Sequence, residues 1–328
     1  MIVVMNKNYT SDDINQVVNY ITNKNLGVNI SKGKHDCVIG ILGDVTEANL
    51  EEIKSLRCVS KILKVQEPYK KANRLFHPED TIVNINGNKI GGKNLGIIAG
   101  PCAVESEEQI VEIARKVKES GANFLRGGAF KPRTSPNSFT GLKEEGLRIL
   151  KAVKEETSLA VITELMDVRD LEKLYEVSDI IQVGSRNMQN FTLLTELGKQ
   201  DKPVMLKRGI AATISEWIGA SDYIAKEGNN KIIMCERGIR TYNDYTRNTL
   251  DLAAVPIVQS KTNFPVIVDP SHGTGVRELV KPMSLAAMAC GADGLMIEVH
   301  PNPSKALSDG MQSLHFEEFE DLMDSLRK

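Results

Sequence analysis

The chain has 328 residues, 41% of them hydrophobic and 26% charged, a composition typical of globular proteins. Its 41 Lys and Arg residues nearly balance 43 Asp and Glu residues, which argues against a large nucleic-acid-binding surface. No apolar run is long enough for a membrane helix, the N-terminus lacks a signal-peptide layout, and the five cysteines are scattered, so we expect a cytoplasmic protein without disulfides.

Residues 1–66 predict a small domain in the order strand, helix, strand, strand, helix, strand. The first helix begins with Ser11-Asp12-Asp13, residue types that cap helix N-termini. This βαββαβ order is typical of ferredoxin-like domains. The expected elements are Met1–Met5, a helix from Ser11, Val28–Ser31, Cys37–Leu42, a helix at Thr46–Leu56, and Cys58–Val65.

Residues 67–80 are polar and contain two prolines, so we interpret them as a linker. The segment Thr81–Ile90 follows, with Asn86-Gly87 between alternating residues. An Asn-Gly pair in that setting indicates a β-hairpin with a tight turn.

Residues 81–328 contain eight apolar strand-like runs from Leu95 onward, each followed by an amphipathic helix. This α/β pattern predicts a (β/α)8 TIM barrel. An open doubly wound sheet is the alternative, but the sequence contains no GxGxxG or Walker motif that would favour a nucleotide-binding version. The expected strands are Leu95–Ala99, Asn123–Arg126, Ala160–Thr163, Ile180–Val183, Pro203–Leu206, Lys231–Met234, Pro265–Val268 and Gly294–Ile297.

Four side chains that commonly bind metals follow expected strands. Cys102 comes after the first strand, His272 after the seventh, and Glu298 after the eighth, with Asp309 in the next loop. The carboxyl ends of parallel barrel strands meet at one mouth, so we expect these side chains to converge there. One thiol, one imidazole and two carboxylates suit a divalent transition metal such as Mn, Fe, Co or Zn, rather than Ca or Mg alone.

Positively charged residues also recur where strands end. One alone would usually be a surface charge, but seven at one mouth would repel each other without a multiply charged anion. We therefore expect small phosphorylated substrates. Cys235 and His300 are less certain site candidates, because either could simply pack in the interior. The seven cations are Arg126, Lys131, Arg133, Arg186, Lys207, Arg208 and Arg237.

Together these motifs resemble the 3-deoxy-D-arabino-heptulosonate 7-phosphate (DAHP) synthases, in the type I beta branch that carries an N-terminal ferredoxin-like regulatory domain. The resemblance covers the whole barrel and fixes residue type, order and spacing at seven strand ends. It lies in Ile98–Cys102, Arg126…Lys131-Pro-Arg-Thr134, Gly184–Met188, Lys207-Arg-Gly209, Cys235–Gly238, Asp269–His272 and Glu298…Asp309.

The resemblance implies a metal-dependent condensation of phosphoenolpyruvate with erythrose 4-phosphate, the first step of the shikimate pathway to chorismate and the aromatic amino acids. It implies that Arg126, Lys131 and Lys207 bind the phosphoenolpyruvate carboxylate, and that Arg186 and Arg237 bind its phosphate. The erythrose 4-phosphate site would comprise Pro132, Arg133, Thr134 and Ser135. As a mechanistic hypothesis, the catalytic residues would be Lys131 as proton donor, with a metal-bound water as the alternative donor, Glu164 as a contact to water, and His272 as a metal ligand.

Two other functions are weighed against this one. The octulosonate 8-phosphate synthases share the barrel chemistry, but their aldose loop resembles Lys-Ala-Asn-Arg-Ser, whereas this chain has Lys131-Pro-Arg-Thr-Ser135. A non-catalytic sugar-phosphate or amino-acid sensor is the second, although no catalytic position is missing. The resemblance further implies a homotetramer and feedback inhibition by tyrosine or phenylalanine, for which Gly27, Asn29 and Ser31 are candidate contacts; a plain hairpin strand is the alternative there.

Overall fold

A computed structural model describes residues 1–33, 37–42, 50–63, 69–132, 135 and 137–327. No helix in these ranges has the length and apolar character needed to cross a lipid bilayer. The chain divides into two compact units, Met1–Asp80 with Ser260–Asn263 and Thr81–Gln259 with Phe264–Lys328.

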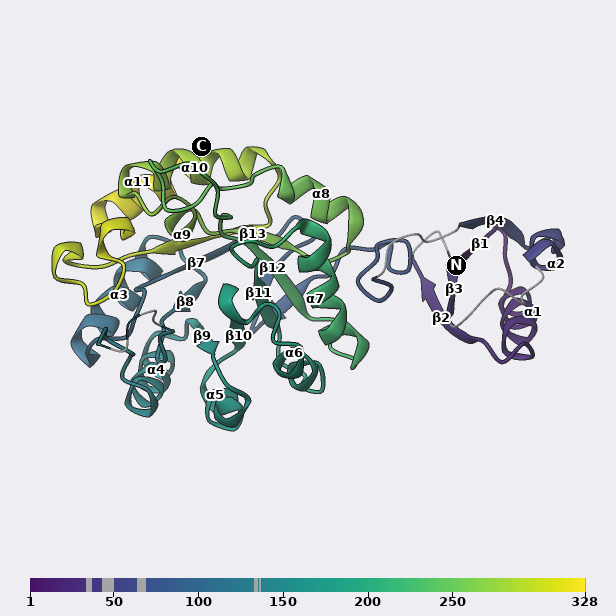
Figure 1. Cartoon of the computed structure of the whole chain (residues 1–328), viewed down its shortest axis with the longest axis horizontal. Helices are drawn as coiled ribbons and strands as arrows, with labels where there is room; N and C mark the ends of the chain where they lie inside the picture. Colours follow the sequence, from purple (N-terminus) through teal and green to yellow (C-terminus); the bar gives the residue numbers. More distant parts are fainter. Residues whose placement is uncertain (34–36, 43–49, 64–68, 133–134, 136, 328) are drawn as a thin grey trace. The chain divides into compact units, whose positions relative to one another are not determined.

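The first unit contains a four-stranded antiparallel sheet with strand order β2-β3-β1-β4, which is the predicted ferredoxin-like arrangement (Figure 1). Helix α1 begins after Thr10, whose hydroxyl and the Asp13 carboxylate cap each other's backbone amides. The apolar side of α1 packs on one face of the sheet, and Val3 and Ile39 lie between them. The elements are β1 (Ile2–Met5), α1 (Ser11–Thr22), β2 (Gly27–Lys32), β3 (Cys37–Leu42), α2 (Leu50–Ser55) and β4 (Val59–Leu63).

The segment interpreted as a linker is ordered against this unit where it is described. Phe76 is only 1% exposed and packs with Ile2 and Val38 on the second face of the sheet. A Cβ on Gly40 would lie 2.2 Å from the Phe76 ring, so the ring needs a glycine at that position. Residues 69–80 therefore supply part of the hydrophobic core of the first unit.

The second unit is a closed barrel of eight parallel strands, which confirms the predicted fold (Figure 1). Hydrogen bonding between β14 and β7 closes the barrel, and the helices lie outside the strands. The strands are β7 (Gly96–Gly100), β8 (Phe124–Arg126), β9 (Ala160–Leu165), β10 (Ile180–Val183), β11 (Val204–Lys207), β12 (Ile232–Glu236), β13 (Val266–Val268) and β14 (Gly294–Glu298).

Helices follow these strands as the sequence predicts. Short 3-10 turns η1 (Val168–Asp170), η2 (Ser185–Asn187), η3 (Pro303–Lys305) and η4 (Gly310–Gln312) add to the loops. The α-helices are α3 (Glu107–Glu119), α4 (Glu144–Thr157), α5 (Leu171–Val177), α6 (Phe191–Gly198), α7 (Ile214–Lys226), α8 (Ala254–Lys261), α9 (Pro270–Thr274), α10 (Arg277–Ala289) and α11 (Phe316–Arg327).

A hairpin closes the amino-terminal end of the barrel. Strands β5 (Val83–Ile85) and β6 (Asn88–Ile90) pair across Asn86-Gly87, both with positive φ, as a tight hairpin turn requires. Val83 and Ile90 are buried in the barrel core together with Ile98 from β7. The site described below lies at the opposite end, where the strands finish.

Candidate active site

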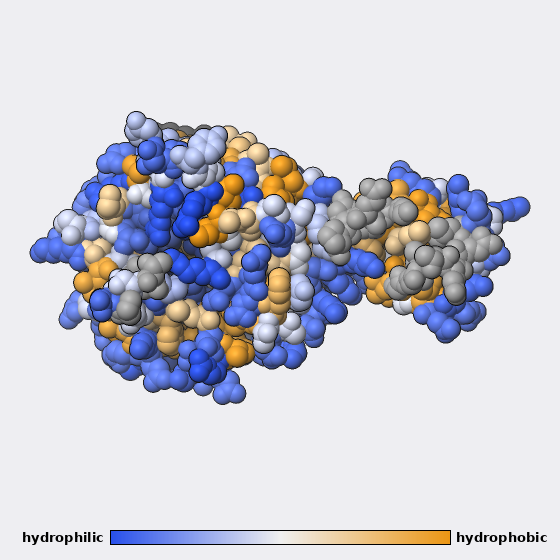
Figure 2. All heavy atoms as spheres, in the orientation of Figure 1, coloured by the Kyte–Doolittle hydropathy of each residue, from blue (hydrophilic) through white to orange (hydrophobic). Residues whose placement is uncertain are grey.

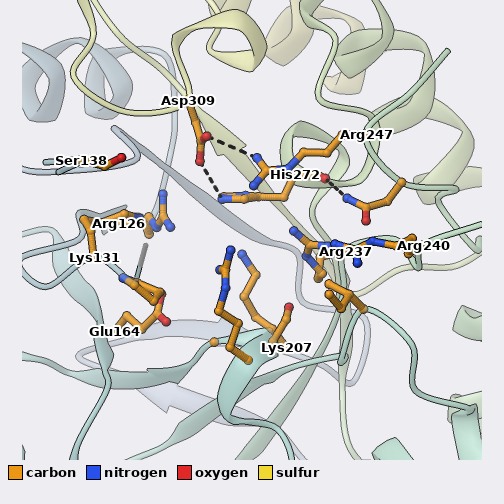
Figure 3. Close-up of a pocket in the computed structure, with 16 residues that line it drawn as sticks. Arg126, Lys131, Ser138, Glu164, Lys207, Arg237, Arg240, Arg247, His272 and Asp309 are labelled. Atoms are coloured by element: carbon orange, nitrogen blue, oxygen red, sulfur yellow. Dashed lines mark hydrogen bonds and ion pairs between the residues drawn. The ribbon is translucent and has the colours of Figure 1, made fainter. Parts of the chain in front are cut away.

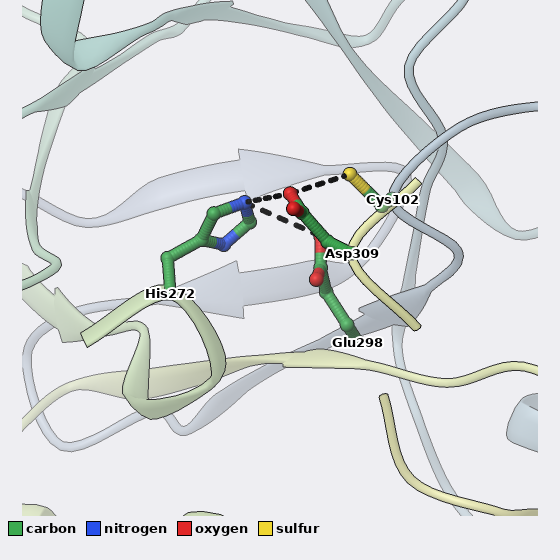
Figure 4. A group of neighbouring side chains, drawn as sticks. All are labelled: Cys102, His272, Glu298 and Asp309. Atoms are coloured by element: carbon green, nitrogen blue, oxygen red, sulfur yellow. Dashed lines mark hydrogen bonds and ion pairs between the residues drawn. The ribbon is translucent and has the colours of Figure 1, made fainter. Parts of the chain in front are cut away.

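The four expected metal ligands come together at the carboxyl end of the barrel (Figure 4). One atom from each of Cys102, His272, Glu298 and Asp309 lies within 4.8 Å of all the others. Cys102 Sγ is 3.2 Å from Asp309 Oδ2, and His272 Nε2 is 3.3 Å from Glu298 Oε1. Metal–ligand bonds of about 2.0–2.3 Å require donor atoms at such separations, so this group could hold one metal ion.

The protonation states in this group suit a divalent cation. Burial raises the pKa of the Cys102 thiol to about 11, and the Glu298 carboxylate adds to the effect. Burial alone would raise the pKa of the Asp309 carboxyl, but His272 and Arg247 hold it below its usual value. Burial lowers the pKa of His272 and favours the neutral ring that can bind a metal. Only the thiol would have to lose a proton when a metal binds.

Asp269, which the sequence did not single out, orients His272. Its Oδ1 accepts a hydrogen bond from the His272 amide at 2.9 Å. Its Oδ2 lies 2.8 Å from His272 Nδ1, a close contact that falls short of hydrogen-bond geometry. The same oxygen accepts a hydrogen bond from Lys207 Nζ at 2.6 Å. A carboxylate behind a ligating histidine fixes the ring, so the Asp-Pro-Ser-His sequence was the available signal.

A hydrophilic pocket adjoins the metal group (Figure 3), and Figure 2 shows a hollow rimmed by hydrophilic side chains in the face of the barrel. Seven of its lining residues are Lys or Arg and only two are acidic. Such an excess of positive charge indicates anionic ligands. The lining residues are Arg126, Lys131, Pro132, Ser138, Glu164, Gly184, Ser185, Arg186, Lys207, Ile210, Arg237, Arg240, Arg247, Asn248, His272 and Asp309.

Three pocket cations contact the metal group or Asp269, the residue that orients His272. Arg126 Nη1 pairs with Glu298 Oε1 at 2.6 Å, and Lys207 pairs with Asp269. Lys131 Nζ donates to the backbone oxygen of Cys102 at 2.9 Å. The positions of these pocket cations and of the metal ligands are therefore mutually fixed.

Arg237 differs because no carboxylate in the described part of the chain pairs with it directly, although Asp269 lies close enough to attract it. Arg237 is 6% exposed. Burial lowers the pKa of Arg237, the Asp269 carboxylate partly opposes this, and the neighbouring Arg247 adds to the lowering. A buried, unpaired guanidinium is costly, so an anion bound beside it would be strongly stabilised.

Glu164 reaches the pocket from the end of β9 and is held by its neighbour on β10. Gln182 Nε2 donates to Glu164 Oε2 at 2.9 Å. A Cβ on Gly184 would lie 2.0 Å from Glu164 Oε1, so only glycine leaves room for the carboxylate.

We expect Gly184→Ala to displace Glu164 and lower kcat roughly 10- to 100-fold in a folded protein, since misplacing a catalytic group by about 1 Å can have that effect. Gly184 has φ of −69°, so alanine would introduce no backbone strain. Steady-state kinetics with circular dichroism would measure this. Gly219→Ala is the matched control, because a Cβ there meets nothing within 4 Å. Equal kcat for both variants would contradict the role given to Glu164.

The expected aldose-phosphate loop is only partly described. Arg133 and Thr134 lie outside the described residues. Pro132 lines the pocket, whereas Ser135 is exposed and is not among the lining residues. The base of the loop is closed by a hydrogen bond from the Lys131 amide to the Thr140 carbonyl at 2.9 Å.

Ser138, Ile210 and three residues of one further loop line the pocket but were not predicted. Arg240, Arg247 and Asn248 lie in the loop between β12 and α8, where no periodicity separates them from surface residues. Arg247 Nη1 is 3.3 Å from Asp309 Oδ1, and Asn248 Nδ2 donates to the His272 carbonyl at 3.0 Å. This loop therefore contacts the metal group.

The two less certain candidates lie outside the pocket. Cys235 is fully buried among the inward-facing core residues of the barrel, and burial raises its pKa to about 12. His300 Nδ1 accepts from the Asn302 amide at 3.0 Å, and its Nε2 lies 3.5 Å from Glu105 Oε2. Both are explained by packing and local hydrogen bonds.

A (β/α)8 barrel with four metal-binding side chains beside a cationic pocket at its carboxyl end is typical of an enzyme that acts on anionic substrates. Comparison with known proteins identifies the family. Residues 79–328 match the DAHP synthetase I family and residues 1–67 match the DAHP synthase ferredoxin-like domain, so the chain belongs to the DAHP synthase family.

Individual relatives agree with this assignment. The chain is 50% identical over 328 residues to a phospho-2-dehydro-3-deoxyheptonate aldolase of Thermotoga maritima, covering 100% of this chain and 97% of the relative. A 2-dehydro-3-deoxyphosphooctonate aldolase of Desulfotalea psychrophila is 33% identical over 265 residues, covering 74% of this chain and 93% of that protein.

Solved structures extend the comparison. The crystal structure of the T. maritima DAHP synthase matches with a TM-score of 0.79 and 49% identity, covering 99% of this chain and 96% of that one. A truncated form of the T. maritima enzyme matches with a TM-score of 0.73 and 48% identity, covering 78% of this chain and 94% of that one.

Proposed function

We propose that this enzyme condenses phosphoenolpyruvate with erythrose 4-phosphate, in a metal-dependent reaction that gives DAHP and inorganic phosphate as the first step of the shikimate pathway. The observation that carries the proposal is the adjacency of the metal group to a pocket with seven cations and two acids. Phosphoenolpyruvate and an aldose phosphate together bring a carboxylate and two phosphates, which match that charge excess.

The burial of the pocket cations supports an assignment of which cations bind the carboxylate and which bind the phosphate of phosphoenolpyruvate. Arg126, Lys131 and Lys207 are all less than 10% exposed and surround the inner part of the pocket. They would bind the carboxylate of phosphoenolpyruvate. Arg237, with Arg186 nearer the solvent, would bind its phosphate, since Arg237 is buried and has no carboxylate pair in the described part of the chain.

The aldose would occupy the pocket side formed by the segment after β8. Pro132 and Ser138 line the pocket there. Arg133 and Thr134, with Ser135, would bind the phosphate of erythrose 4-phosphate, as the family resemblance implies. This orientation directs the aldehyde toward the metal group.

Cys102, His272, Glu298 and Asp309 would hold the metal, which when bound would act as a Lewis acid on the aldehyde oxygen. Carbon 3 of phosphoenolpyruvate attacks the aldehyde carbon, and Lys131 protonates the oxygen that gains the electron pair. Water oriented by Glu164 adds at carbon 2, and cleavage of the C–O bond releases phosphate. One phosphoenolpyruvate, one erythrose 4-phosphate and one water thus give DAHP and phosphate.

Phosphate release would test this function. Phosphoenolpyruvate and erythrose 4-phosphate would be incubated with the Mn-loaded protein, with an EDTA-treated sample and with arabinose 5-phosphate as the competing aldose. We expect metal-dependent release with erythrose 4-phosphate alone. Release with arabinose 5-phosphate would assign the octulosonate reaction instead. If folded, metal-loaded protein released no phosphate with either aldose, the result would indicate a binding protein. Repeating the assay with Mn, Fe, Co and Zn would rank the metals by the rate of phosphate release.

A regulatory role for residues 1–66, with 67–80 as the connection to a catalytic domain at 81–328, completes the proposal. Strand β2 is an edge strand that carries Gly27, Asn29 and Ser31. The Asn29 side-chain NH2 is buried and has no hydrogen-bond partner among the residues that the structure describes. An edge strand with an unsatisfied donor is a suitable contact for the carboxylate of tyrosine or phenylalanine. The family resemblance suggests that this occurs in a homotetramer.

Deleting residues 1–66 is expected to keep kcat within about twofold while abolishing inhibition by tyrosine or phenylalanine, since effector and substrates would occupy different sites. The solved truncated form of the T. maritima relative supports the choice of this deletion. Inhibition curves of the full-length and shortened proteins would be compared. Inhibition that persists in the shortened protein would place the effector in the barrel instead.

A further inference from the structure

Arg208 was expected at the barrel mouth, but it does not line the pocket. It is 3% exposed, and its side chain turns away from the barrel interior toward helix α7. Its Nη1 lies 2.9 Å from Glu236 Oε2 and 2.8 Å from Asp251 Oδ2, and its Nε donates to the Ala212 carbonyl at 3.0 Å. Arg208 is therefore part of a buried network of one cation and two carboxylates.

Glu236 is the centre of this network. It is 0% exposed at the end of β12, and its second oxygen, Oε1, accepts from the Gly238 amide at 2.6 Å and faces the Asp251 amide at 3.4 Å. One carboxylate thus joins the two ends of the loop 238–251. The ion pair between Arg208 and Glu236 connects this loop to the end of β11, because Arg208 directly follows Lys207.

The loop that is closed in this way forms one wall of the pocket. It contributes Arg240, Arg247 and Asn248, and it follows Arg237 directly. The turn at Gly238 has φ of +85°, and a Cβ there would lie 2.7 Å from Asn248 Cβ. The wall is tightly packed at its base, so a small shift of Glu236 would be transmitted to Arg237 and the loop.

Electrostatics give the network a second effect. Arg237, Arg240 and Arg247 are like charges on one short segment and repel each other, and Arg247 contributes to the lowered pKa of Arg237. Burial raises the pKa of Glu236 and Arg208 opposes this, so with Glu236 ionised the network of Arg208, Glu236 and Asp251 carries one net negative charge. Glu236 attracts Arg237 and so opposes the repulsion without occupying the pocket, in addition to the larger attraction from Asp269.

We propose that Arg208 and Glu236, assisted by Asp251, are positioning residues that hold Arg237 and the loop 238–251 in place to bind a phosphate group. The inference rests on the proposed function, in which that group is the phosphate of phosphoenolpyruvate. None of the three residues lines the pocket, so they act through Arg237 and the loop.

Glu236→Gln is the primary test, because it keeps the side-chain size but replaces one accepting oxygen with an NH2 group. Either orientation of the amide loses the Arg208 contact or the Gly238 contact. We expect the KM for phosphoenolpyruvate and the inhibition constant of inorganic phosphate to rise at least about tenfold. The kcat, the KM for erythrose 4-phosphate and the metal content should stay within about threefold.

Lys154→Gln is the matched control for a merely structural loss. Lys154 Nζ pairs with Asp179 Oδ1 at 2.6 Å, and neither residue lines the pocket. This variant should lower the Tm but leave both KM values unchanged. Arg208→Lys keeps the charge but loses the Nε donor to the Ala212 carbonyl, so it should raise the KM for phosphoenolpyruvate less than Glu236→Gln does.

If Glu236→Gln does not fold, the double variant Arg208→Met/Glu236→Gln replaces it, because removing both members of a buried ion pair is tolerated better than removing one. The double variant should show the same rise in the KM for phosphoenolpyruvate. A folded variant with a lower Tm and an unchanged KM would overturn the inference and leave the network a purely structural role.

Calorimetric titration of phosphoenolpyruvate into metal-loaded protein without aldose separates this inference from the proposed function. Wild-type protein that binds phosphoenolpyruvate but shows no turnover, with weaker binding in Glu236→Gln, would reject the proposed reaction and support the positioning role. Turnover in the wild type with equal phosphoenolpyruvate affinity in both proteins would support the proposed reaction and reject the positioning role.

Discussion

Cys102→Ala is expected to lower turnover by at least about 1,000-fold, because losing a metal ligand removes Lewis-acid stabilisation worth several kcal/mol. The thiol lies 3.2 Å from Asp309 Oδ2 and is buried, so water has little room to replace it. Metal analysis should show less than one metal ion per chain, and EDTA should reduce the wild-type protein to a similar rate.

Cys290→Ala serves as the control for this variant. Cys290 is a partly exposed free cysteine at the end of α10, outside the metal group. Its replacement should change neither metal content nor turnover. A Cys102→Ala protein that keeps one tightly bound metal ion and wild-type turnover would show that the thiol is not a required ligand.

Lys131→Met is expected to lower kcat by roughly 100-fold or more and to raise the KM for phosphoenolpyruvate, because a positioned proton donor typically contributes 10²–10⁴-fold. Lys131 is 7% exposed, and its Nζ donates to the Cys102 carbonyl. The same ammonium group would therefore lie close to both the carboxylate and the aldehyde oxygen. Single-turnover kinetics would separate slower chemistry from weaker binding.

Lys151→Met, on the exposed side of α4, is the control and should behave as wild type. The Lys131→Met protein must also retain its fold and metal for the comparison to be valid. Full turnover under those conditions would assign the proton transfer to another group.

The architecture of the barrel was predictable because repeated strand–helix units leave few other folds for a chain of this length. The metal group was predictable for a related reason: the ends of parallel strands converge, so residues far apart in sequence, such as Cys102 and His272, must lie close together. The packing of Phe76 against Gly40 was not predictable, since an isolated aromatic residue in a polar segment carries no periodic signal.

Arg208 illustrates what the sequence analysis overlooked. Ile233 and Cys235 face the barrel interior, so Arg237 does too, whereas Glu236 points outward. By the same alternation Lys207 faces inward, as Met205 does, and Arg208 outward. Counting residues along each strand would have separated the pocket cations from the supporting network. Arg240 and Arg247 could not be found in this way, because their loop has no alternation.

The hairpin of β5 and β6 has a consequence for the order of events at the site. Val83 and Ile90 pack in the amino-terminal end of the barrel, so the pocket is reached from the mouth at the opposite end. Four of the cations proposed for phosphoenolpyruvate, Arg126, Lys131, Lys207 and Arg237, are buried in this pocket, whereas Arg186, Pro132 and Ser138 are more exposed. If the enzyme has the proposed function, phosphoenolpyruvate would therefore bind before the aldose, because an aldose already at the rim would obstruct its passage.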